Sequence, residues 1–302
     1  MTKAHRGKRD KVEKGDAAIQ PSDVAIAAQL ACLLEVSTPK PGNVSPGRHF
    51  HDARYEDFLA SAAAIGGALA SADTRPLGAT VRLAIDATAR WARSNTNLGT
   101  VLLLAPLARA ALLGSNDLRN GVRQVLDETT VDDAREVYEA IRRASPGGLG
   151  TAEAEDVAEE PTMSLLDVMR LAVDRDGIAK EYSTGFELTF EVGAPALTQA
   201  RHDGLSWEDA ITETFMTLLA AAPDTHIARR AGAARASEVS GLARAALYEG
   251  GVRTDAGLRA IDEMDRELRD ARNTKNPGTT ADLTASSIFV VLLNGGWDLR
   301  SA

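Results

Sequence analysis

Four polar breaks interrupt a chain that is otherwise rich in alanine and leucine, and they hold most of the side chains that can do chemistry. They cover residues 38–43, 95–99, 223–232 and 276–283. Each contains glycine or proline, the residues that most often mark turns and helix ends. Because the breaks share this composition, we expect one site assembled from loops that are far apart in the sequence.

The first break is a rigid, cationic end to an apolar helical run. Two prolines flank Lys40, and each fixes its own φ and disfavours helix in the residue before it. Gly42 then lets the backbone approach whatever Lys40 faces, and Asn43 adds an amide. Glu35 lies just before the break. Taken alone, the segment fits either a stiff linker or one wall of a binding site.

The loop that follows brings two imidazoles and a carboxylate close to Lys40 in the sequence. These groups are His49, His51 and Asp52. Two histidines can ligate a metal ion, but a two-residue spacing in a loop is a weak signature of a metal site. The loop therefore adds polar groups to the predicted site without indicating a zinc centre.

The second break precedes an apolar helix, and its geometry allows two interpretations. Asn95 and Thr96 can satisfy free backbone N–H groups at the start of this helix. A helix start of this kind can also bind an anion. The segment contains two asparagines, Asn95 and Asn97, although one would suffice as a cap. Both interpretations therefore remain open.

The third break has the highest density of charge. His226 and Arg230 share one helical face at a spacing of four residues, and Asp224 lies at the start of that helix. Arg229 or Arg230 can bind a phosphate through two hydrogen bonds. The alternative is an aspartate cap followed by solvated arginines.

The fourth break also resembles a helix start. Asp282 is close enough to the start of that helix for its negative charge to interact favourably with the helix dipole. Alternatively, it can hold Mg²⁺ or a ribose hydroxyl. Gly278 lies at the beginning of the same segment.

A further acidic segment lies outside the four breaks. Residues 174–176 (Asp-Arg-Asp) form either a surface salt-bridge set or a second acidic ligand pair.

Helical periodicity surrounds these breaks, and strand-like alternation is scarce. A Gly-rich and then acidic stretch, residues 145–161, is the clearest non-helical segment, with a turn expected near the site. The pattern predicts a single all-α domain over residues 21–302. The predicted helices cover residues 22–34, 55–72, 80–93, 98–113, 117–127, 131–144, 164–173, a region up to 201 that is broken near 193–195, 206–222, 227–248, 255–272 and 281–293.

The composition narrows the function classes. The chain has 302 residues and a net charge of −9, but residues 1–16 carry +3, and we expect residues 1–20 to form a disordered basic tail. The acidic body argues against a nucleic-acid-binding domain, so an anionic ligand needs a local positive pocket. No apolar run approaches the roughly 20 residues that span a bilayer, which argues against a membrane role. The sequence indicates no oligomeric state.

A single cysteine, Cys32, excludes intramolecular disulfides and cysteine-based zinc sites, and we expect a cytoplasmic protein. The chain also lacks a phosphate-binding Gly-x4-Gly-Lys-Ser/Thr loop and a Gly-x-Gly-x-x-Gly segment after a strand. Any nucleotide must therefore bind to a helical site of another kind.

In this order, the segments resemble the triphosphoribosyl-dephospho-coenzyme A synthase family over about residues 24–293. The resemblance rests on Glu35 with residues 38–42, the 49–52 region, Asn95-Thr96-x-x-Gly99, residues 175–182, Asp224-Thr225 with Arg229-x-x-Gly232, and Pro277-Gly278-x-x-Ala281-Asp282-Leu283. The loop at 145–150 (Ser-Pro-Gly-Gly-Leu-Gly) looks like an archaeal-type branch of this family.

The resemblance implies an all-helical transferase that joins ATP to 3′-dephospho-coenzyme A, releases adenine and makes the precursor of a lyase prosthetic group. The ribose 2′-hydroxyl of the acceptor would attack C1′ of ATP while the triphosphate stays attached. Such a displacement builds oxocarbenium character, which carboxylates near the sugar stabilise. The hydroxyl needs a base, adenine needs a proton donor, and the triphosphate needs Mg²⁺ and cations.

These demands assign hypothetical roles to residues of this chain. The expected cofactor is Mg²⁺ with ATP, bound by Asp224 and Asp282. The expected catalytic residues are Glu35, Asp52 and Asp224. The expected substrate- and ATP-binding residues are Lys40, Gly42, Asn43, His49, Asn95, Thr96, Arg229, Arg230, Gly278 and Asp282.

Two departures from the family pattern leave the acceptor open. His49-Phe50-His51-Asp52-Ala53 stands where lyase-associated members have His-Arg/Lys-Asp-Met, and Asn97-Leu98 replaces a basic residue. Three alternatives therefore remain: ATP-dependent ribosyl transfer to another acceptor in cofactor biosynthesis, a non-catalytic nucleotide-binding or regulatory protein, and a metal-dependent helical phosphohydrolase.

Overall fold

A computed structural model describes residues 19–115, 117–147 and 150–298. Most of the predicted basic tail, residues 1–18, lies outside this range, so the tail remains a prediction. The described residues contain α-helices, short 3₁₀-helices and one π-helix, but no strand, which confirms the all-α prediction.

The helices occur in the following order along the chain. They are α1 (Pro21–Ser37), α2 (Tyr55–Leu69), η1 (Ala72–Thr74), α3 (Leu77–Thr88), α4 (Leu98–Leu112), α5 (Leu118–Asp127), α6 (Val131–Ala144), α7 (Leu165–Leu171), α8 (Gly177–Thr184), η2 (Leu188–Gly193), α9 (Ala194–His202), α10 (Trp207–Ala221), α11 (Thr225–Ala231), α12 (Ala233–Tyr248), η3 (Gly251–Arg253), α13 (Asp255–Leu268), α14 (Gly278–Leu293) and η4 (Gly296–Asp298).

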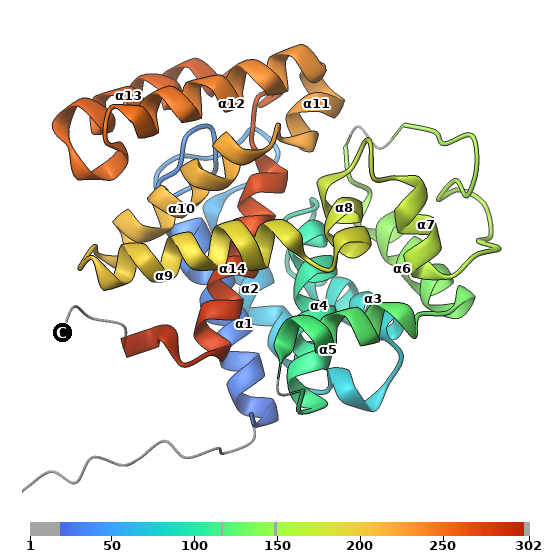
Figure 1. Ribbon diagram of the computed structural model, residues 1–302. Coiled ribbons are helices and arrows are strands. Elements are labelled where there is room, and N and C mark those ends of the chain that lie inside the picture. Colours follow the sequence, from blue (N-terminus) through green and yellow to red (C-terminus); the bar gives the residue numbers. More distant parts are fainter. Residues whose placement is uncertain (1–18, 116, 148–149, 299–302) are drawn as a thin grey trace, which may run out of the picture.

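Two helices, α4 and α14, run through the larger hydrophobic core, which draws residues from α1 through α10 and from α14. Both are buried over most of their residues, as expected for helices surrounded by protein. A second, smaller core lies beneath α10–α13. Figure 1 shows α11–α13 stacked at one end of the molecule, with α14 passing below them toward α1. The start of α14 therefore lies where the two cores meet.

Two predicted helices are divided in the structure. The predicted helix 227–248 is interrupted at Gly232, which has φ +93°, a conformation that side chains rarely adopt. The helical region before residue 201 contains α8, the π-helix η2 and α9. The break at Gly232 matters for function because it leaves α11 as a short separate helix beside the start of α14.

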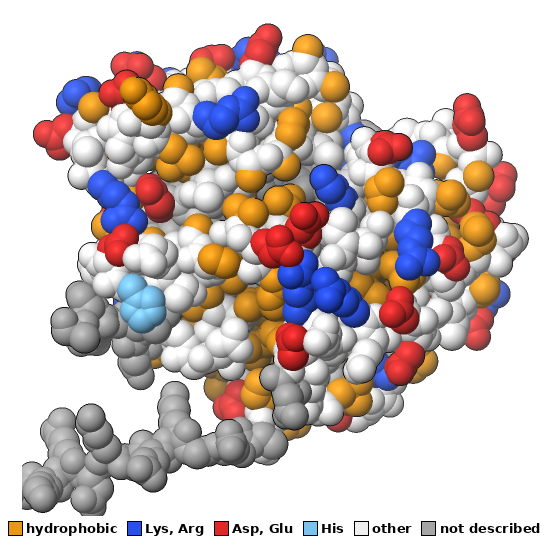
Figure 2. Space-filling model, viewed as in Figure 1, with side chains coloured by type: hydrophobic (Ala, Val, Ile, Leu, Met, Phe, Trp, Pro, Cys, Tyr) orange, Lys and Arg blue, Asp and Glu red, His pale blue; other side chains and the backbone are white. Residues whose placement is uncertain are grey.

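Acidic and basic side chains are interspersed across the face shown in Figure 2, and no broad basic surface is present on that face. In the described part of the chain, no helix is both long enough and apolar enough to cross a bilayer.

Candidate functional site

A cavity of about 650 Å³ is lined by parts of all four polar breaks. Its wall is formed by α1, the loops around residues 43–53 and 93–99, the segment after α6, the α7–α8 region, α11 and the start of α14. This volume is in the range of small-molecule sites. The structure thus brings together loops that are as far apart as Asn43 and Asn276, which are separated by 233 residues, as the shared composition of the breaks predicts.

Nine of the predicted site residues line this cavity. They are Glu35, Asn43, Asp52, Asn95, Thr96, Arg229, Arg230, Gly278 and Asp282. Four others do not belong to the wall, and each is explained below. They are Lys40, Gly42, His49 and Asp224.

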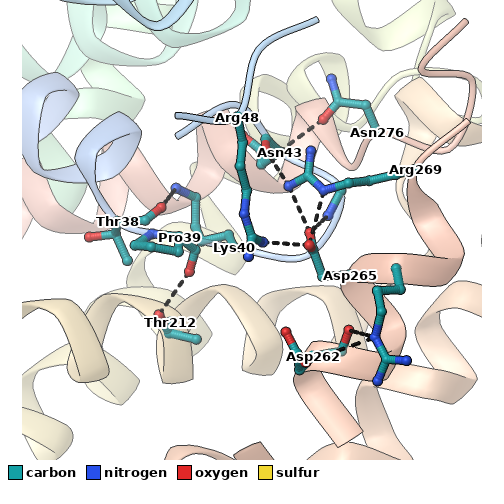
Figure 3. Close-up of polar contacts among 12 residues, drawn as sticks. Thr38, Pro39, Lys40, Asn43, Arg48, Thr212, Asp262, Asp265, Arg269 and Asn276 are labelled. Carbon is teal, nitrogen blue, oxygen red and sulfur yellow. Dashed lines mark hydrogen bonds and ion pairs between the residues drawn. The ribbon is translucent and has the colours of Figure 1, made fainter. Parts of the chain in front are cut away.

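Lys40 is buried and does not line the cavity, so its predicted contact with phosphate gains no support from the structure. Its Nζ donates to the backbone carbonyl oxygens of Glu35 and Thr38, the latter at 2.8 Å, and lies 3.1 Å from Glu35 Oε1. Figure 3 shows the side chain folded back toward Thr38. Burial lowers the pKa of Lys40 and raises that of Glu35. Because Glu35 does line the cavity, Lys40 positions a cavity-lining carboxyl group through this ion pair.

Gly42 also has a structural role in place of the predicted substrate contact. Its backbone N–H donates to Asp265 Oδ1 at 2.8 Å. A Cβ at Gly42 would lie 2.9 Å from Leu268 Cβ, and its φ of +73° favours glycine. Figure 3 shows Arg48 and Arg269 converging on the same carboxylate. The glycine therefore allows the 38–43 segment to dock closely on α13.

His49 is exposed and does not line the cavity, so its predicted substrate contact gains no support. Its Nδ1 accepts a hydrogen bond from the backbone N–H of Tyr55 at 3.1 Å, at the start of α2. His51 is exposed as well, with Nδ1 3.2 Å from Asn273 Nδ2. In the part of the chain that the structure describes, no group of three or more His, Cys, Asp or Glu residues is placed to hold a metal ion.

Asp224 joins two helices, and its contacts give no support to its predicted metal and acid/base roles. Its Oδ1 accepts from the N–H of Ile227 at 3.0 Å, which caps α11. Its Oδ2 accepts from the N–H of Thr280 at 2.7 Å and from the Thr280 hydroxyl at 2.8 Å. The residue is only 2% exposed. Its oxygens are thus engaged in holding the start of α11 against the start of α14.

Asp282 lies on the cavity wall in an environment that favours its protonated form. Thr100 Oγ1 donates to its Oδ1 at 2.6 Å. Gly99 makes room for it, since a Cβ at that position would lie 2.1 Å from Asp282 Oδ2. Burial, assisted by the negative charge of Glu35, raises the pKa of Asp282 to about 7. A carboxyl group in this state can give or take a proton near neutral pH.

Cationic side chains on α11 line another part of the cavity. Arg229 forms an ion pair with Asp176 at 2.8 Å, and Asp176 also caps α8 through the N–H of Ile178. Arg230 donates to the backbone carbonyl of Arg272 at 2.9 Å. Arg229 is thus compensated by Asp176, whereas Arg230 has no acidic partner among the ion pairs of the described residues.

Amide and hydroxyl side chains complete the wall. Asn43 Nδ2 donates to Asn276 Oδ1 at 2.9 Å, which ties the first break to the fourth. Asn95 Oδ1 accepts from the N–H of Leu98 at 3.0 Å, so the residue serves the start of α4 while lining the cavity. Thr96 is hydrogen-bonded to Ser61. The structure therefore confirms the capping interpretation for Asn95, and anion binding at this helix start stays a prediction.

Several wall residues were not selected from the sequence as site residues. The main ones are Asp176, His226 and Asn276. For His226, the spacing of four residues from Arg230 is a signal that could have indicated it, whereas no spacing rule indicates Asp176 or Asn276. The segment after α6 also contributes to the wall, as expected of the 145–161 loop, although residues 148 and 149 lie outside the described part.

Comparison with known proteins places the chain in a family. The family model described as ATP:dephospho-CoA triphosphoribosyl transferase matches residues 21–301. A crystal structure from Archaeoglobus fulgidus, described as that of a triphosphoribosyl-dephospho-coA synthase, superposes with a TM-score of 0.61 at 30% identity, covering 80% of this chain and 100% of that one.

Curated relatives match over shorter stretches. A protein of Pseudomonas aeruginosa strain UCBPP-PA14, named probable 2-(5''-triphosphoribosyl)-3'-dephosphocoenzyme-A synthase, is 33% identical over 124 residues, which is 40% of this chain and 42% of the relative. Its counterpart in strain PAO1 is 30% identical over 162 residues, 49% of this chain and 55% of the relative. The chain thus matches about half the length of these relatives or less. The family model and the Archaeoglobus fulgidus structure both match most of the length of this chain. The chain therefore belongs to the ATP:dephospho-CoA triphosphoribosyl transferase family.

Proposed function

We propose that the chain transfers the triphosphoribosyl group of ATP to 3′-dephospho-coenzyme A and releases adenine. The observation that carries this proposal is the cavity, whose lining includes two arginines of α11 and Asp282, a carboxyl group with a raised pKa. The reaction needs both kinds of group, because it must hold a polyanion and also move protons at a sugar.

Arg229 and Arg230 are the proposed ligands of the triphosphate. Both line the cavity, and a guanidinium group can offer two parallel hydrogen bonds to a phosphate. On binding, Arg229 would exchange its contact with Asp176 for the phosphate or share it. Asn43, Asn95, Thr96 and Gly278 stay proposed substrate contacts, because each lines the same cavity.

Asp282 is the proposed proton donor to the leaving adenine. Its raised pKa keeps a proton available near neutral pH, and Thr100 fixes the orientation of the carboxyl group. Glu35, held by Lys40, is the proposed carboxyl group beside the ribose, where positive charge develops in the transition state. Asp52 lines the cavity but is exposed, so it is a weaker candidate for acid/base work.

We treat Mg²⁺ as part of the substrate, carried by the phosphates of ATP. Of the two predicted ligands, Asp224 is engaged by backbone and hydroxyl donors. The described residues include no cluster of three potential ligands. Magnesium is commonly bound by one or two carboxylates together with substrate phosphates, and such a mode requires no cage of protein ligands. We propose a cytoplasmic location, where ATP is available.

The direct test is incubation of the full chain with ATP, Mg²⁺ and 3′-dephospho-coenzyme A, followed by chromatographic measurement of adenine. Adenine should appear only when both substrates are present. Release of inorganic phosphate or ADP without adenine would instead support a phosphohydrolase, and binding of ATP without any product would support a regulatory role.

A further inference from the structure

His226 lines the cavity but has no part in the roles assigned above. It is the second residue of α11 and lies between Asp224, which caps that helix, and the two arginines. Its backbone N–H donates to Thr279 Oγ1 at 3.2 Å, which fixes the start of α11 against α14. The position of the imidazole ring is therefore determined by two helix starts.

One hydrogen bond determines which ring nitrogen carries the proton. His226 Nδ1 lies 2.9 Å from the backbone carbonyl oxygen of Asn276. A carbonyl oxygen only accepts hydrogen bonds, so Nδ1 must be the donor. In the neutral ring, Nε2 then carries a lone pair and acts as an acceptor. Among the hydrogen bonds of the described residues, His226 Nε2 has no partner.

The surroundings of the ring favour its neutral form and restrict its movement. Burial lowers the pKa of His226, and Arg229 and Arg230 act in the same direction, whereas the Asn276 carbonyl and Asp224 oppose them. From α14, the Thr279 hydroxyl accepts a hydrogen bond from the backbone N–H of His226, and Asp282 lines the same cavity. A Cβ at Gly278 would lie 3.0 Å from Nδ1, so the glycine leaves space for the ring.

We propose that His226 is the general base of the transfer reaction, with Nε2 accepting the proton of the attacking hydroxyl. This inference rests on the proposed function. The hydroxyl oxygen forms a bond to C1′ of ATP while the bond from C1′ to adenine N9 breaks. The electron pair of the broken bond leaves with adenine. The hydroxyl proton passes to His226, and adenine receives a proton from Asp282. The two residues exchange protons with solvent before the next turnover.

The other acid/base groups of the cavity are less suited to this step. Asp176 is paired with Arg229, and Glu35 is paired with Lys40. Asp282 has a pKa raised to about 7 and serves better as the acid. When one group has a lowered pKa and another has a raised pKa, their environments separate the base from the acid. His226 and Asp282 form such a pair.

The test compares His226→Asn with the wild-type chain. Asparagine can keep a donor near the position of Nδ1 while it removes the acceptor at Nε2. We expect kcat for adenine release to fall by about 10²–10⁴-fold, the usual contribution of general acid–base catalysis. The Kd of ATP, measured by calorimetry, should change less than threefold. His202→Asn, at the exposed end of α9, is the matched control and should retain wild-type activity.

Two further measurements separate catalysis from a structural role. Added imidazole should restore part of the activity of His226→Asn. The fall in wild-type kcat/KM at low pH, caused by protonation of Nε2, should be absent from the variant. If folded His226→Asn keeps kcat within threefold of wild type, or if only KM for the acceptor rises, the proposal is wrong. Should the variant fail to fold, a wild-type rate that stays flat as His226 protonates would overturn it.

The wild-type control distinguishes a failure of the proposed function from a failure of the base role of His226. Wild-type chain that releases no adenine contradicts the proposed function and the base role together. Wild-type chain that releases adenine, combined with an unaffected His226→Asn variant, contradicts only the base role.

Discussion

Lys40 Nζ lies 3.1 Å from Glu35 Oε1 in a buried ion pair, yet of the two residues only Glu35 lines the cavity. The two residues are five positions apart, and the rigid segment that follows α1 turns the lysine back toward the end of that helix. The most unusual feature of the sequence therefore positions a carboxyl group of the proposed site.

Lys40→Met tests this relationship. Removing one partner of a buried pair leaves an uncompensated charge, which typically costs about 3–5 kcal/mol. We expect a loss of that size in the free energy of unfolding, measured by urea denaturation. Lys275→Met should have little effect, because Lys275 does not belong to a buried pair. The double variant Lys40→Met/Glu35→Gln should recover part of the loss. Unchanged stability with weakened ATP binding would restore the phosphate role of Lys40.

Gly99→Ala tests the packing of Asp282. A Cβ at position 99 would lie 2.1 Å from Asp282 Oδ2, so the carboxyl group must move. A displacement of about 1 Å in a catalytic site can reduce turnover roughly 100-fold. We expect a loss of this order in adenine release. Gly67→Ala on α2 is the control, because a Cβ there meets nothing within 4 Å, and it should stabilise the helix by up to about 1 kcal/mol. Equal activity of the two variants would contradict the packing argument.

The raised pKa of Asp282 predicts how stability changes with pH. Between about pH 4 and pH 7, the folded chain keeps this proton while the unfolded chain has released it. The folded state then binds more protons, so its stability falls as pH rises through this range. The penalty is complete above about pH 7 and amounts to at most about 4 kcal/mol.

Asp282→Asn should remove this penalty. Its free energy of unfolding should gain relative to wild type as pH rises from about 4 to 8, as measured by denaturation at a series of pH values. The variant should also lose adenine release at all pH values. A stability difference that does not vary with pH would show that the pKa of Asp282 is not raised.

Arg229→Ala tests the phosphate end of the cavity. Hydrogen bonds to charged groups contribute about 1.5–3 kcal/mol, so the Kd of ATP should rise by about 10–100-fold. Arg170→Ala is the matched control, since Arg170 pairs with Asp167 on α7 and does not line the cavity. Calorimetry at fixed ionic strength measures both. An equal effect of the two substitutions would assign the loss to general charge and not to a phosphate contact.

The helical architecture could be predicted where local signals are strong. The predicted bounds of α6 are those of the structure, because the Thr130 cap and the following apolar stripe are local features. The division between α11 and α12 was missed, because an isolated glycine within a helical pattern gives only a weak signal. The positive φ at Gly232 is evident only in the structure.

The site was predictable at the level of segments and less so at the level of side chains. Asn95, Arg229 and Asp282 line the cavity as expected. Lys40 and Asp224 do not. Asp224 is held by Thr280, which is far away in the sequence, and Lys40 turns back onto Glu35 and Thr38 at the end of α1. Sequence periodicity does not show which polar side chains will be hydrogen-bonded or ion-paired within the protein and which will be free to bind a ligand.

The most direct measurement is the stoichiometry of products from ATP and 3′-dephospho-coenzyme A. Mass spectrometry and chromatography on one reaction should detect one adenine for each conjugate whose mass equals the sum of both substrates less adenine. The triphosphate should remain intact in that conjugate. Adenine without the conjugate, or phosphate release in its place, would contradict the proposed transfer.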